Sequence, residues 1–106
     1  MNAQFKRGII ELCVLKIIND KERSTFEVIE TLGEKIDVNK NTIYPILRRL
    51  TKQNYFETYT ESSTVGAPRK IYKITPYGFK KLESFQKEWK HFLNNVLEIL
   101  GGREDD

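Results

Sequence analysis

The first predicted helix, over approximately residues 4–19, is hydrophobic on almost every side. Its apolar positions are Phe5, Ile9, Ile10, Leu12, Cys13, Val14, Leu15, Ile17 and Ile18. A helix that is apolar all round must be buried all round, and a small domain seldom covers a helix completely. We therefore expect this helix to contact both its own core and a second subunit.

Two amphipathic helices are predicted next. Ser24 and Glu27 have the spacing of a capping box, which marks the start of the second helix. The apolar face of this helix is predicted to consist of Phe26, Ile29, Leu32 and Ile36. The third helix is indicated by apolar residues at the i, i+3, i+4, i+7 spacing, namely Ile43, Ile46, Leu47 and Leu50.

The asparagines and the proline of this segment indicate where the third helix begins. Either Asn39 or Asn41 is able to cap it, because an asparagine side chain accepts a hydrogen bond from the first free amides. Pro45 is tolerated in the first turn, whereas deeper inside the helix it would remove a hydrogen bond and kink the chain. We therefore expect Pro45 to lie near the start.

A β-hairpin is predicted after the third helix. Residues 55–60 and 71–75 are rich in aromatic and β-branched side chains, which favour strands. The polar segment 61–68 between them contains glycine and proline, so the tip is expected to be long. Arg69 and Lys70 place two cations at the end of this tip.

A final helix of 25 residues is predicted from Pro76, with Thr75 as its cap and a glycine pair as its stop signal. It would be roughly 37 Å long, nearly three times the radius of gyration of about 13 Å for such a domain, so its far end must project. Its apolar stripe consists of Leu82, Phe85, Trp89, Phe92, Val96 and Leu100. This stripe would aggregate unless a second chain covers it, so we predict that it forms a dimer interface with Phe5 and Ile9.

Composition narrows the class of protein. The 106 residues allow one domain with one core. One cysteine and one histidine exclude a disulfide framework and a zinc-binding cluster, and Cys13 is interpreted as a small core residue. No apolar run approaches 18 residues and no signal-peptide pattern is present, so we expect a soluble, cytoplasmic protein. Without a nucleophile–base pair or a phosphate-binding glycine loop, neither an enzyme nor a cofactor or metal is expected.

Positive charge is concentrated in the centre of the chain. The whole chain has 18 basic and 15 acidic side chains, a net charge of +3. Residues 37–54 contain four basic side chains and one acidic one, and so carry the same excess. A modest net charge says little alone, so this local concentration on the third helix is the informative feature.

The order of three helices, a hairpin and a long helix is that of a winged helix-turn-helix, a mostly helical α+β fold with a two-stranded wing. Residues 1–75 would form a DNA-binding domain, and residues 76–106 a dimerisation helix with an acidic tail. The outer face of the third helix offers amide, hydroxyl, aromatic and cationic groups suited to the major groove. These come from Asn41, Thr42, Tyr44, Pro45, Arg48 and Lys52.

Several motifs resemble those of a known family, the PadR-like transcriptional regulators. Residues 41–50, NTIYPILRRL, are similar to the family's T-L-Y-P-x-L-x-R-L recognition helix, and residues 66–72, GAPRKIY, to its G-P-x-R-K-Y-Y wing. Residues 75–78, TPYG, resemble its L-T-x-x-G entry to the last helix. The resemblance covers about residues 5–97 and fits the short subclass with one C-terminal helix. It implies a homodimer that represses genes and sometimes releases DNA on binding a small molecule.

The chain departs from the family at the start of the second helix, where STFE at residues 24–27 replaces H-G-Y-E. Any contact of that segment with DNA must pass to Ser24 and Thr25. The predicted DNA-contacting residues are Ser24, Thr25, Asn39, Lys40, Asn41, Thr42, Tyr44, Pro45, Arg48, Lys52, Arg69 and Lys70. The operator would be pseudo-palindromic, with half-sites roughly 10 bp apart.

Trp89 is the candidate for an effector site. In drug-responsive members of the family, a tryptophan on the last helix faces its symmetry mate across a cavity at the dimer interface. Trp89 lies 14 residues after Thr75, which fits that placement. The resemblance implies a planar hydrophobic effector that stacks there, with Phe85 and Phe92 nearby. The alternative is that the aromatic stripe is dimer core alone.

Each feature that favours DNA binding also has a simpler explanation. The basic face can be a solvated surface, Tyr44 can be anchored in the packing by its hydroxyl, and Arg69 and Lys70 can protect a strand edge from aggregation. A winged helix can also serve as a protein–protein interaction module without DNA. That function would need an exposed apolar face on the third helix, whereas the outer positions here are polar and basic.

Overall fold

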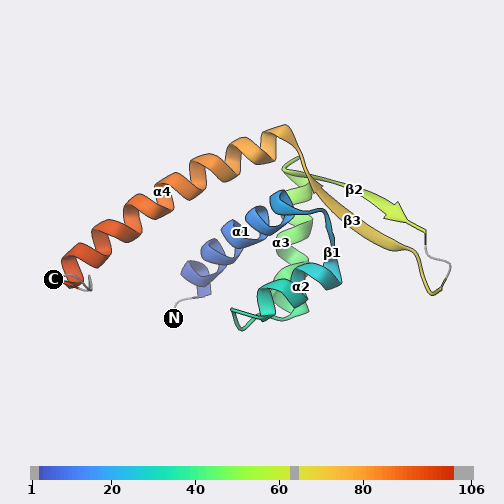
Figure 1. The fold of residues 1–106 in the computed structure, drawn as a ribbon, viewed down its shortest axis with the longest axis horizontal. Helices are drawn as coiled ribbons and strands as arrows, with labels where there is room; N and C mark the ends of the chain where they lie inside the picture. The colour runs from blue at the N-terminus through green and yellow to red at the C-terminus, as the bar shows by residue number, and fades with distance from the viewer. Residues whose placement is uncertain (1–2, 63–64, 102–106) are drawn as a thin grey trace.

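The computed structural model describes residues 3–62 and 65–101, with side chains from residue 7 onward. The elements are α1 (Ala3–Asp20), β1 (Arg23–Ser24), α2 (Thr25–Gly33), α3 (Lys40–Lys52), β2 (Phe56–Glu61), β3 (Arg69–Ile74) and α4 (Pro76–Leu100). The first three helices form a body from which α4 and the β2–β3 wing extend in opposite directions (Figure 1). The predicted fold class, a mostly helical winged helix with a long final helix, is confirmed. The side chain of Phe5 and the acidic tail at residues 104–106 lie outside the described part.

α1 is covered on only part of its surface. Its buried residues Ile10, Val14, Leu15 and Ile18 form the centre of the core. Leu12, Cys13 and Ile17 are half-buried at the edge of that core. The protomer therefore leaves one apolar side of α1 incompletely covered, as the all-round hydrophobic pattern predicts.

α2 begins with the predicted capping box. The Ser24 hydroxyl accepts a hydrogen bond from the Glu27 backbone amide at 3.2 Å, and the Glu27 carboxylate accepts one from the Ser24 amide at 2.9 Å. The predicted apolar face is wrong at its first position, because Phe26 is 68% exposed while Val28 is buried. Val28 and Leu32 are four residues apart and share the buried face, and Phe26 lies roughly 200° round the helix from Val28.

α3 begins at Lys40, with Asn39 as its cap: the Asn39 side chain accepts a hydrogen bond from the Asn41 amide at 2.8 Å. The predicted position of Pro45 in the first turn is wrong, because Pro45 is the sixth residue of the helix. The interior proline costs about 3 kcal/mol. Four buried side chains on the opposite face, each contributing about 1.5–3 kcal/mol, offset that cost. They are Ile43, Ile46, Leu47 and Leu50, as predicted.

Among the described residues the sheet contains three strands rather than the predicted two, in the order β1-β3-β2. β1 pairs antiparallel with β3 through only two residues, and β2 pairs with β3 from Phe56↔Ile74 to Glu61↔Arg69. Arg69 and Lys70 therefore lie inside β3 and not at the tip. The wing is longer than the sequence indicates, because the ladder extends to the charged pair Glu61↔Arg69.

α4 has the predicted ends. The Thr75 hydroxyl accepts a hydrogen bond from the Gly78 amide at 2.9 Å, and Gly101 ends the helix in the left-handed conformation. A Cβ at Gly78 would lie 2.1 Å from the Tyr55 carbonyl oxygen, so the first turn of α4 packs directly on the chain leading into β2. The longest dimension of the molecule is 56 Å, against 27 and 24 Å for the others, since α4 projects beyond the body (Figure 1). In the described part of the chain, no helix has the length and hydrophobicity needed to span a membrane.

Candidate nucleic-acid interface

The outer face of α3 is a continuous polar surface. Lys40, Tyr44, Arg48 and Lys52 follow one another every four residues and are all exposed, and Asn41 and Pro45 are exposed beside them. Residues four apart share one face of a helix, and this face is opposite the four buried side chains. Two of the predicted DNA contacts differ in accessibility, since Thr42 is half-buried whereas Tyr44 is 44% exposed. We call the exposed residues Lys40, Asn41, Tyr44, Pro45, Arg48 and Lys52 the recognition face.

Arg49 lies next to this face but has a different partner. Its guanidinium forms an ion pair with the carboxylate of Glu11 on α1. Both side chains are partly shielded from solvent, with Glu11 the more buried of the two. The two neighbouring arginines therefore differ in their surroundings, because Arg48 is exposed whereas Arg49 attaches α3 to α1.

The predicted DNA contacts at the starts of α2 and α3 differ in their exposure to solvent. Ser24 is only 4% exposed, and both its hydroxyl and its amide are engaged with Glu27. This burial removes Ser24 from the surface that we propose for DNA. Thr25 is half-buried at the first position of α2, and Asn39 is exposed although its side-chain oxygen caps α3.

The two wing cations have different surroundings. The Arg69 guanidinium donates a hydrogen bond to Glu61 at 2.8 Å and lies 3.9 Å from the carboxylate of Glu27. Lys70 is exposed, and its ammonium lies 5.7 Å from the centre of the Tyr72 ring. The pKa of Glu27 is lowered, first by the backbone hydrogen bond from Ser24 and then by the Ser24 hydroxyl and the charges of Arg69 and Lys21, while burial opposes this shift.

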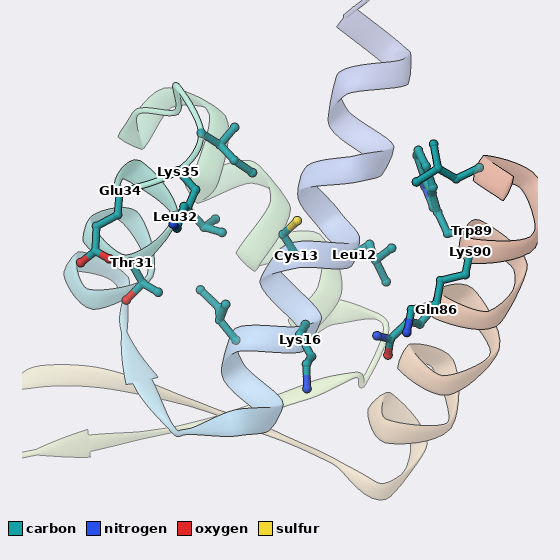
Figure 2. A pocket seen from close by; sticks show the side chains of 13 residues that line it. Leu12, Cys13, Lys16, Thr31, Leu32, Glu34, Lys35, Gln86, Trp89 and Lys90 are labelled. Carbon is teal, nitrogen blue, oxygen red and sulfur yellow. The ribbon is translucent and has the colours of Figure 1, made fainter. Parts of the chain in front are cut away.

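An apolar groove lies between α1, the end of α2 with the turn that follows it, and α4 (Figure 2). Its volume is about 490 Å³. Its apolar lining comes from Leu12, Cys13, Ile17, Leu32, Ile36, Trp89 and Leu93. Three lysines also line it, namely Lys16 on α1, Lys35 just after α2 and Lys90 on α4. Burial raises the pKa of the Cys13 thiol, which keeps it protonated at neutral pH.

Only one of the three residues predicted to bind an effector lines this groove. Trp89 does so, with its ring centre 6.1 Å from that of Phe92 in an edge-to-face arrangement. Phe85 instead packs against the core, and Phe92 is 55% exposed. The α1 and α2 residues of the groove were missed by sequence reasoning, although the uncovered apolar side of α1 was a usable signal for its first wall.

The apolar stripe of α4 divides into two parts. Leu82, predicted at the dimer interface, is 3% exposed and belongs to the core of its own protomer, so burial removes it from the surface available to a partner. Beyond Trp89 the stripe is open, and Leu100 is 71% exposed. Val96 and Ile9 are half-buried. The exposed surface also includes Leu93, Leu97 and Ile99, which sequence reasoning did not select.

Comparisons with known proteins agree with this architecture. A family model described as "Transcriptional regulator PadR-like family" matches residues 14–84. A PadR-like transcriptional regulator from Bacillus cereus is 32% identical with a TM-score of 0.84, and the match covers 95% of this chain and 100% of that one. A PadR-like transcription factor from Bacteroides fragilis is 30% identical with a TM-score of 0.80, covering 92% of this chain and 95% of that one.

A third solved structure, a protein of Streptococcus mutans, is 31% identical with a TM-score of 0.83, covering 92% of this chain and 91% of that one. A search of curated proteins finds no significant match. The family model covers most of the chain, including α2, α3 and the wing. The solved structures match the chain nearly end to end. The chain therefore belongs to the PadR-like family of transcriptional regulators.

Proposed function

We propose that the protein is a homodimeric, sequence-specific DNA-binding repressor of the cytoplasm. Residues 1–75 bind DNA, and residues 76–106 provide the dimerisation helix. The observation that carries this proposal is the recognition face, where six exposed residues stand on a helix whose opposite face is fully buried. Such a helix fits the major groove, where arginine pairs with guanine and asparagine with adenine.

Phosphate contacts would supply much of the affinity. Lys40 and Lys52 stand at the two ends of α3, and Lys70 lies on the wing. Lysines in such positions fix the orientation of a protein on the duplex without reading sequence. Each neutralised phosphate releases counterions, so the affinity should fall steeply with salt.

Dimerisation is supported by the open part of α4. Phe92, Leu93, Leu97, Ile99 and Leu100 are exposed large apolar side chains on a projecting helix. A soluble monomer rarely leaves such a patch uncovered. A second copy packed against this end of α4 and the open side of α1 would cover it, and would set the half-sites about one helical turn apart.

The groove beside Trp89 supports a planar hydrophobic effector. Its lining is mostly apolar, and Trp89 provides a flat surface for stacking. Occupation next to α4 would change the angle between the two recognition helices, so that both half-sites cannot be met together. Because Trp89 is the single tryptophan, its fluorescence tests this part directly. An unchanged emission with a panel of planar hydrophobic compounds would contradict it.

Fluorescence anisotropy tests the main proposal. The labelled duplex is the DNA upstream of the protein's own gene, compared with a scrambled duplex at two salt concentrations. We expect preference for the native sequence and strong weakening with salt. Absence of binding even at low salt would contradict the proposal and favour a winged-helix protein-interaction module instead.

A further inference from the structure

A group of side chains connects the wing to the chain on either side of β1. The Tyr59 hydroxyl donates a hydrogen bond to Glu22 at 2.5 Å, just before β1. Arg69 donates to Glu61 at 2.8 Å and lies 3.9 Å from Glu27, in the first turn of α2. We call these five residues the wing clamp.

The clamp occupies one face of the wing. Successive side chains of a strand point to opposite faces, so Tyr59 and Glu61 share a face of β2. Arg69 stands directly opposite Glu61 in the ladder and belongs to that face. Lys70, the next residue, lies on the other face, opposite Thr60 and close to the Tyr72 ring. The two neighbouring cations of the wing are therefore directed to opposite sides.

The clamp compensates for a very short strand. β1 forms only two residue pairs with β3, at Arg23↔Tyr72 and Ser24↔Ile71. The β2–β3 ladder continues beyond them for two more pairs, at Thr60↔Lys70 and Glu61↔Arg69, without a third strand. The Arg69–Glu27 contact joins this outer part to α2 through the same carboxylate that completes the capping box. Arg69 is thus the residue that contacts both the outer end of β2 and the first turn of α2.

The charges of the clamp oppose a phosphate contact on its face. The clamp contains three carboxylates and one guanidinium. If Arg69 turned to a phosphate, it would leave Glu61 and Glu27 unpaired beside a polyanion. Like charges at such distances repel one another, so the exchange of partners is unfavourable. Lys70 has no such carboxylate among its described contacts.

We propose that Arg69 is a positioning residue that holds the wing against α2 through Glu61 and Glu27, and that Lys70 on the opposite face makes the wing's phosphate contact. The inference rests on the proposed DNA-binding function. It divides the two wing cations into one that sets the wing angle and one that meets the nucleic acid.

Amide hydrogen exchange of the free, full-length protein tests the positioning role without DNA. We expect Arg69→Gln and Glu61→Gln each to speed exchange at the outer amides of β2 and β3 by roughly two- to fivefold, the range for one cross-strand ion pair. The double variant should exchange no faster than Arg69→Gln alone, because Arg69→Gln already removes the contacts with both Glu61 and Glu27. Lys70→Gln is the matched control and should leave these rates unchanged. Unchanged exchange in Arg69→Gln would overturn the positioning role.

The salt dependence of DNA binding tests the division of roles. Lys70→Gln should lower the slope of log affinity against log salt by about one, the value for one lost phosphate contact. Arg69→Gln should weaken binding a few-fold with an unchanged slope, and Glu61→Gln should weaken it similarly. A slope lowered by about one in Arg69→Gln, or tighter binding in Glu61→Gln, would overturn the proposal. If the wild-type chain bound no duplex, the proposed function and the role of Lys70 would both fail, and the exchange rates would still decide the role of Arg69.

Discussion

The helices α3 and α4 are both amphipathic, but the protomer buries the whole apolar face of α3 and only part of the apolar face of α4. α3 places all four of its core residues against the body and leaves a polar, basic face outside. α4 places Leu82 in the core and leaves a row of large apolar side chains outside. The residue type left exposed is the reason for proposing a different partner for each helix: a nucleic acid for the polar, basic face of α3 and a second protein chain for the apolar face of α4.

The largest effect is expected on the buried side of α3. Leu47→Ala should lower the free energy of unfolding by about 2–5 kcal/mol, because Leu47 is fully buried and its loss leaves a cavity. Leu47→Met conserves volume and should cost less than about 1.5 kcal/mol. Urea unfolding measures both variants. If Leu47→Ala lowered the free energy of unfolding by less than about 1 kcal/mol, the apolar face of α3 would not be packed in the core of its own protomer.

The open side of α4 should determine assembly. Phe92→Glu places a charge in the apolar stripe and is expected to convert the proposed dimer to a monomer of 12.5 kDa. Asn94→Glu adds the same charge at an exposed polar position of the same helix and serves as the control. Sedimentation equilibrium gives the mass. A dimer that persists in Phe92→Glu would place the subunit contact elsewhere.

Two adjacent arginines of α3 allow the proposed DNA contact to be tested separately from packing. Arg48→Ala should weaken operator binding by roughly 5- to 150-fold and reduce the preference over scrambled DNA, as for a lost base contact of about 1–3 kcal/mol. Arg49→Ala removes the ion pair with Glu11, so its effect on DNA binding should be less than about threefold. Anisotropy titrations compare the two. Equal losses of DNA affinity in the two variants would show that DNA does not bind specifically to the exposed side of α3.

The smallest effect concerns the start of α2. The pKa of Glu27 is lowered from its usual 4.5, so its charge stabilises the fold at pH values above 4.5, and this contribution is lost as the pH falls through the lowered value. Glu27→Gln retains an acceptor but not the charge. The free energy of unfolding of the wild type should exceed that of Glu27→Gln by only a few tenths of a kcal/mol at pH 7, because solvent screens the charge. The difference should vanish in acid, where the carboxylate is protonated. A constant difference across pH would contradict this account.

Local chemistry made much of the fold predictable. The Ser24–Glu27 box and the Thr75 cap each depend on residues within one turn of helix, whereas the same local chemistry left both Asn39 and Asn41 open as the cap of α3. The recognition face follows from the same periodicity, because the buried positions of α3 define the exposed ones. Phe26 misled the prediction for α2, since spacings of three and four residues fit Phe26 with Ile29 as well as Val28 with Leu32.

Features assembled from distant segments were not predictable. β1 has two residues and exists only through its pairing with β3, so it leaves no periodic signal. The groove joins α1, α2 and α4, which are far apart in the sequence. The contact of Arg69 with Glu27 crosses from the wing to α2, and Pro45 was placed too early because the packing of α3 overrides its local preference.

A hydroxyl-radical footprint of the DNA upstream of the gene tests the central claim most directly. Two protected half-sites require both DNA binding through α3 and pairing of two subunits through α4. The account predicts two protected half-sites roughly 10 bp apart, both lost in Phe92→Glu and both weakened in Arg48→Ala. One protected half-site that persists in Phe92→Glu, or uniform protection without a preferred sequence, would contradict it.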